Sequence, residues 1–183
     1  MKTSFFVISA LFAAGLSTEA QTPAATATPE QLAEGKKNYM MVCVACHQPT
    51  GLGLPSVFPP LTNSEYVSGS PERYAAMILK GNAGPMTVDG KLYNNIMPGQ
   101  EAMLTDEKIA SIMTYTRASF GNNAPPVTPE LVANTRKKFA DRKTPWTEPE
   151  LKAWKDDSAP AASEAPVIPA TPAPSAPPAA PAP

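Results

Sequence analysis

The chain has 183 residues, a net charge of −1 at pH 7, 23 prolines, two cysteines and one histidine. The balanced charge excludes the basic surface typical of nucleic-acid-binding proteins, so nucleic acid is not an expected partner. A structural zinc site needs four nitrogen or sulfur ligands, and the cysteines and histidine provide three. Residues 21–157 are enough for one compact domain.

Residues 1–20 have the pattern of a secretory signal peptide. They contain Lys2, an apolar run over residues 5–16 and a small residue at Ala20. The run is shorter than the roughly 20 residues needed to span a bilayer, although an uncleaved anchor is the alternative. We therefore predict a periplasmic or otherwise exported protein without an integral membrane segment after cleavage. A Thr/Ala/Pro linker over 21–28 follows.

Helix-start signals recur along the rest of the chain. A serine or threonine precedes a proline or an acidic residue, which is the pattern of an N-cap followed by a first helical turn. Glycines and prolines predict loops over 48–63 and 82–103, and no strand pattern of useful length is present. The sequence therefore predicts an all-α fold. Its helices are expected to begin at Pro29, Pro71, Asp106, Pro129 and Glu148.

Both cysteines and the only histidine lie in one run, Cys43-Val44-Ala45-Cys46-His47. C-x-x-C-H is the attachment signature of haem c, in which two thiols bind the porphyrin and the adjacent imidazole ligates the iron. A thioredoxin-like pair would need a βαβ context, which the helix and loop signals do not provide. A Cys43–Cys46 disulfide is the simpler alternative in an exported protein.

With this motif, residues 28 to about 121 resemble the class I c-type cytochromes. The resemblance implies a cytochrome c fold, with helices and long loops wrapped around one covalent haem c, and a haem domain over 29–121. The stretch 94–99, Asn-Asn-Ile-Met-Pro-Gly, looks like the family's distal ligand loop. It implies His47 and Met97 as the iron ligands, and Met86 and Met103 are the competing methionines.

The resemblance extends to smaller features. It implies that the carbonyl of Pro60 accepts the Nδ1 hydrogen of His47, with Pro59 as the rival. Gly35 fits a close crossing of the first and last core helices. The region from Gly84 to Met97 is similar to cytochrome domains that are subunits or fused modules of periplasmic oxidoreductases.

The chain continues beyond the common domain. Two further helices are expected in a C-terminal extension over 122–157. The basic cluster 136–138, with Arg142 and Lys143, is interpreted as a solvated helix face, and a docking patch is the alternative. The Ala/Pro-rich segment 158–183 predicts a disordered tail, which could also be a cell-wall spacer or a tether.

The predicted function is electron transfer by one haem c with His/Met ligation. We expect no enzymatic activity, and redox proteins (a dehydrogenase, reductase or oxidase) as partners that dock transiently. Two alternatives stand beside this reading. One is a haem enzyme or gas sensor with an open or displaceable distal site, which would need a distal acid/base group. The other is a fixed cytochrome subunit of a dehydrogenase or oxidase complex.

Overall fold

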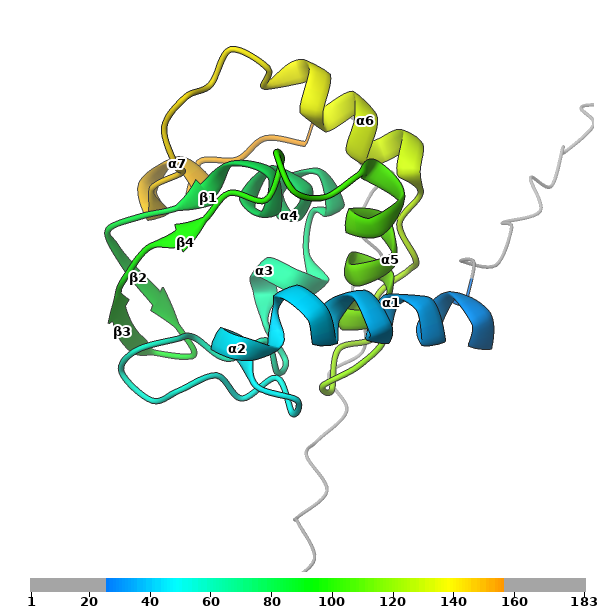
Figure 1. The fold of residues 1–183 in the computed structure, drawn as a ribbon. Helices are drawn as coiled ribbons and strands as arrows, with labels where there is room; N and C mark the ends of the chain where they lie inside the picture. Colours follow the sequence, from blue (N-terminus) through cyan, green and yellow to red (C-terminus); the bar gives the residue numbers. More distant parts are fainter. Residues whose placement is uncertain (1–25, 157–183) are drawn as a thin grey trace, which may run out of the picture.

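The computed structural model describes residues 26–156, so the predicted signal peptide, the first part of the linker and the tail over 158–183 lie outside the described residues. In that part, no helix has the length and apolar character needed to cross a membrane. Seven helices and four short strands are present in residues 26–156 (Figure 1). In chain order they are α1 (Pro29–Val42), α2 (Val44–His47), α3 (Glu65–Ser68), α4 (Pro71–Lys80), β1 (Gly81–Asn82), β2 (Pro85–Val88), β3 (Lys91–Asn94), β4 (Met97–Pro98), α5 (Asp106–Arg117), α6 (Pro129–Lys138) and α7 (Glu148–Lys152).

The five helix starts predicted from the sequence are confirmed. Four helices have a cap whose hydroxyl oxygen accepts a hydrogen bond from the third amide of the helix, as in the 3.3 Å bond from the Gln31 amide to Thr28. At α7 the Thr147 amide donates to the Glu150 carboxylate over 2.8 Å. These caps act within one turn, which is why a local pattern locates them.

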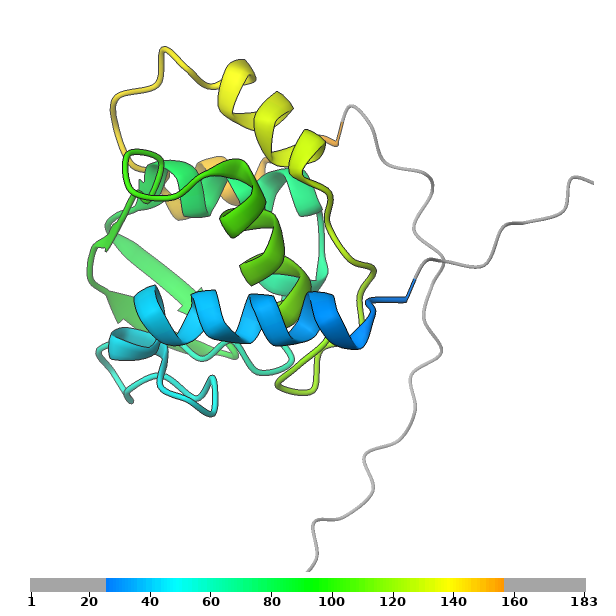
Figure 2. The same ribbon diagram turned by 45° about the vertical axis from the view of Figure 1, so that its right-hand side comes forward.

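Helix α1 crosses α5 closely (Figure 2). The crossing occurs at Gly35, where a Cβ would overlap the carbonyl oxygen of Ser111 and lie 2.6 Å from the Cβ of Tyr115. The side-chain amide of Asn38 donates to the Ser111 hydroxyl over 2.9 Å. The missing side chain at Gly35 therefore lets the two helix backbones meet.

The expectation of an all-α fold is correct only at the coarse level, because the fold is mostly helical with two small sheets. β2 pairs with β3 as an antiparallel hairpin, and β1 pairs with β4. Apart from Gly81, these strands lie in the region 82–103, for which the sequence predicted loop. They are two to four residues long, so the alternation that identifies a strand hardly develops between the glycines and prolines.

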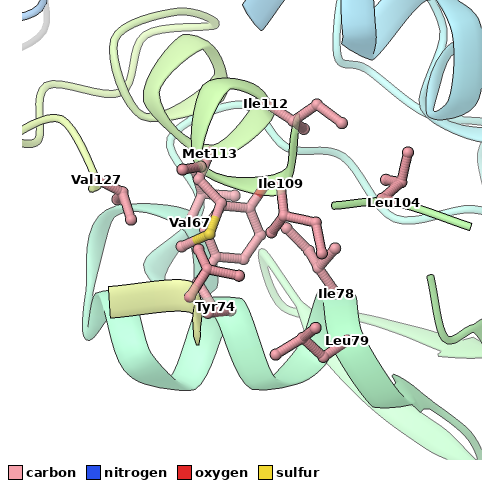
Figure 3. Packing of buried hydrophobic residues seen from close by; sticks show 12 residues of the cluster. Val67, Tyr74, Ile78, Leu79, Leu104, Ile109, Ile112, Met113 and Val127 are labelled. Carbon is pink, nitrogen blue, oxygen red and sulfur yellow. The ribbon is translucent and has the colours of Figure 1, made fainter. Parts of the chain in front are cut away.

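The buried residues form two clusters. The first, here the helical cluster, lies between α4 and α5 and includes Val127 and Val132 of the C-terminal extension (Figure 3). The second, here the hairpin cluster, joins β2 and β3 to α7. Its members are Tyr66, Ala76, Met77, Met86, Val88, Tyr93, Trp146 and Leu151. Because the extension contributes to both clusters, it packs on the same body as the preceding helices.

Candidate functional site

The two cysteines and His47 lie where α1 gives way to α2. α1 ends at Val42, and the four-residue α2 ends at His47. The turn is continuous in hydrogen bonding, since the Cys43 amide donates to Tyr39 and the His47 amide to Cys43. The Tyr39 hydroxyl donates to the carbonyl of Gln48 over 2.6 Å and fixes the exit of α2.

The ring of His47 is held by a backbone carbonyl. Its Nδ1 lies 3.1 Å from the carbonyl oxygen of Pro59, so the expectation of Pro60 is corrected in favour of its neighbour. Gly53 packs against Pro59, whose carbonyl oxygen would lie 2.6 Å from a Cβ at that position. This contact fixes which carbonyl faces the imidazole.

A deep cleft separates the helical cluster from the hairpin cluster. The space among its lining residues, open solvent included, is about 1240 Å³. Members of both clusters line it. The wall includes Cys43, Cys46, His47, Met97, Pro59, Pro60 and the apolar residues Val57, Phe58, Leu61, Ile96 and Ile112. The cleft therefore joins the predicted attachment motif to the predicted distal methionine.

The structure reduces the choice among the methionines. Met103 is 74% exposed and is not part of the cleft wall. Met86 is buried in the hairpin cluster, where its sulfur accepts a hydrogen bond from the side-chain amide of Asn82 over 3.6 Å. Met97 is partly buried and packs against the helical cluster, as does Cys43. Met86 and Met77 also line the cleft.

Burial sets the protonation of the site residues. It raises the pKa of the Cys43 thiol to about 11, and the nearby Cys46 adds to this. Burial also lowers the pKa of His47, although the bond to Pro59 opposes the shift. Both shifts favour the uncharged form of the group, and the neutral imidazole is the form that binds a metal.

The cationic side chains of Arg117 and Lys80 are engaged away from the cleft. Arg117 donates to the carbonyls of Val67, Gly69 and Pro125, and Lys80 forms a 2.6 Å ion pair with Glu101. Neither residue lines the cleft. The polar groups that do line it include Tyr66, Tyr74 and Tyr93, which the sequence analysis did not select because buried tyrosines resemble ordinary core residues.

The donors in this cleft fit haem c. Two thiols, one neutral imidazole and thioether sulfurs share one apolar wall, and these are the groups that attach and ligate a c-type haem. A mostly helical fold around such a cleft defines a class I c-type cytochrome, which carries a covalently bound haem c.

Comparison with known proteins assigns the family. The cytochrome c family model matches residues 32–119. Cytochrome c-552 of Thermus thermophilus is 35% identical over 94 residues, which cover 49% of this chain and 70% of the relative. The chain belongs to the cytochrome c family, and its function is haem-based electron transfer.

Longer relatives match over a small part of their length. The cytochrome c subunit of a quinone alcohol dehydrogenase from Gluconobacter oxydans is 32% identical over 92 residues, covering 50% of this chain and 19% of the relative. The corresponding subunit from Komagataeibacter europaeus is also 32% identical, over 98 residues and 19% of its length. The segment 122–156 lies beyond the residues that the family model matches.

Proposed function

We propose that this chain is an exported single-electron carrier, with haem c attached through Cys43 and Cys46 and ligated by His47 and Met97 in both oxidation states. The observation that carries the proposal is the cleft itself, whose wall includes these four residues. When bound, the group supplies an iron that alternates between Fe(II) and Fe(III).

The chain's own residues prepare this site. Pro59 orients the His47 ring and fixes its tautomer, which strengthens the imidazole as a ligand. A methionine sulfur opposite a histidine raises the reduction potential. Apolar side chains such as Phe58 and Ile112 line the cleft and lower its polarity, which disfavours the extra charge of the oxidised state. Keeping both ligands in both states limits the rearrangement that accompanies transfer.

Visible spectroscopy of the full-length holoprotein tests the ligand assignment. We expect a sharp reduced spectrum of haem c and a weak far-red band of sulfur ligation in the oxidised protein. Met97→Ala should remove the far-red band, whereas Met86→Leu and Met103→Ala should keep it. Loss of the band in Met86→Leu and its survival in Met97→Ala would assign the ligand to Met86. A high-spin wild type would favour an open-site enzyme or sensor.

Export and partners are tested separately. If residues 1–20 are a cleaved signal, the protein from the periplasmic fraction should begin at Gln21 by mass spectrometry. The similarity to dehydrogenase cytochrome subunits makes a fixed subunit the second candidate. Stable co-purification with a dehydrogenase at high salt would favour that candidate, while transient docking predicts a holoprotein that purifies alone.

A further inference from the structure

The position of Met97 depends on a very short strand. β4 consists of Met97 and Pro98, and each pairs with one residue of β1, Asn82 and Gly81 respectively. A Cβ at Gly81 would overlap the carbonyl oxygen of Met97, so the two backbones are in direct contact. Two residue pairs alone hold a strand weakly. Because Gly81 contacts the Met97 backbone directly, a displacement of β1 would also displace Met97.

The C-terminal extension holds β1 from its other side. The Trp146 amide donates to the carbonyl of Gly81, and the Ala83 amide donates to the carbonyl of Trp146, both over 2.9 Å. The Trp146 side chain is buried, and its Nε1 donates to the carbonyl of Ala76 over 3.0 Å. The Arg142 guanidinium lies 3.6 Å from the ring centroid. The backbone of Trp146 is therefore fixed against β1 by its own side chain.

A second part of the extension holds the segment that follows β4. Arg136 on α6 donates from Nη1 to the carbonyl of Glu101 over 2.7 Å and from Nη2 to that of Leu104 over 2.9 Å. Its Nε forms a 2.8 Å ion pair with Asp106 at the start of α5. One planar guanidinium thus bonds two backbone carbonyls between β4 and α5 and the side chain of the first residue of α5.

We propose that the extension 122–156 is the positioning element for the distal ligand, with Trp146 and Arg136 holding Met97 in place from its two sides. This inference rests on the proposed ligation by Met97. The extension would raise the free energy needed to move the thioether away from the iron, and so protect the site from exogenous ligands. Arg136 and Trp146 are positioning residues, since neither lines the cleft.

The test measures the affinity of the ferric, full-length holoprotein for imidazole. Binding is monitored through the loss of the far-red band. Arg136→Met removes all three contacts of the guanidinium. Its matched control is Lys138→Met, which removes the same charge from the same helix but breaks the 2.7 Å ion pair to Glu72 on α4. Arg136→Lys keeps the charge and loses the fork.

We expect Arg136→Met to bind imidazole at least tenfold more tightly than the wild type, and Lys138→Met to stay within twofold. Arg136→Lys should resemble Arg136→Met, because geometry and not charge positions the loop. Hydrogen exchange in the peptides covering 97–104 should accelerate in both Arg136 variants. Equal imidazole affinity in Arg136→Met and Lys138→Met would overturn the inference.

If the Arg136 variants do not accumulate as holoprotein, a milder variant tests the same proposal. Trp146→Phe keeps an aromatic ring in the hairpin cluster and removes the bond to Ala76; we expect several-fold tighter imidazole binding, and unchanged binding would contradict the proposal. Failure of the proposed ligation by Met97 would give another result, because the wild type would then lack a far-red band that depends on Met97.

Discussion

The two buried clusters on either side of the cleft differ in composition and in how they are assembled. The helical cluster is mainly aliphatic and joins helices far apart in sequence, from α4 to α6. The hairpin cluster is rich in aromatic residues and methionine, and joins a hairpin of two four-residue strands to a five-residue helix. α4 contributes to both clusters, with Ile78 in one and Met77 in the other. We therefore expect the helical cluster to hold together without the cofactor and the hairpin cluster to depend on it, because β2, β3 and α7 are short.

Removing the two attachment cysteines should have the largest effect on the stability of the two clusters. We expect Cys43→Ser/Cys46→Ser to lose most of the folding free energy, which for a domain is about 5–15 kcal/mol, because the apolar cleft is left without its filling. Amide exchange should become fast first in the hairpin cluster, while α5 keeps partial protection. Cooperative melting at the wild-type temperature would show that the clusters do not need the cofactor.

A pair of truncations compares the clusters directly. Ile109 and Leu151 are both 0% exposed, one in each cluster. We expect Ile109→Ala and Leu151→Ala each to cost about 2–5 kcal/mol. Urea unfolding should show Ile109→Ala as a loss of global stability. Leu151→Ala should instead produce local opening of α7 and β2, seen by hydrogen exchange. Identical exchange patterns in the two variants would mean that the clusters unfold as one unit.

Two glycines offer a smaller contrast. Gly35→Ala places a Cβ on the Ser111 carbonyl and should cost about 1–3 kcal/mol by separating α1 from α5. At the hairpin turn, Gly90 has φ +68° and no atom within 4 Å of an added Cβ, so Gly90→Ala should cost about 1 kcal/mol from backbone strain alone. Thermal unfolding measures both, and a larger loss for Gly90→Ala would contradict the contact at Gly35.

The smallest expected effect is electrostatic and lies beside the hairpin cluster. The hydrogen bond from Arg142, reinforced by the Thr147 amide, lowers the pKa of Glu150 to about 2 from a usual 4.5. A lowered pKa in the folded state stabilises the protein above pH 4.5, and this stabilisation is lost as the pH falls towards 2. Because the carboxylate is partly exposed, Glu150→Gln should cost less than about 1 kcal/mol at pH 7. The difference between variant and wild type should disappear near pH 2.

Local signals in the sequence predicted the helices well. The caps at Thr28, Ser70 and Thr105 each act over three residues, and all were located correctly. The C-x-x-C-H run likewise identified haem c, because its chemistry lies in five adjacent residues. Met97 was selected by resemblance to a family, and the structure places it in the same cleft as His47.

Features that depend on distant parts of the chain were not predicted. The pairing of Trp146 with β1 uses backbone atoms, which leave no pattern in the side chains. Arg136 was interpreted as part of a solvated face, yet it donates to carbonyls on the segment before α5. The choice between Pro59 and Pro60 depends on which carbonyl the loop turns towards His47. Two adjacent prolines give no sequence signal for that orientation.

The pairing between Trp146 and β1 also affects the association of one copy of this chain with another. A strand at the edge of a sheet presents free amides and carbonyls that can pair with another molecule, which is a common route to aggregation. Here the carbonyl of Gly81 and the amide of Ala83 are already bonded to Trp146. The extension thus closes an edge next to the haem cleft, and copies at high concentration cannot join through that strand.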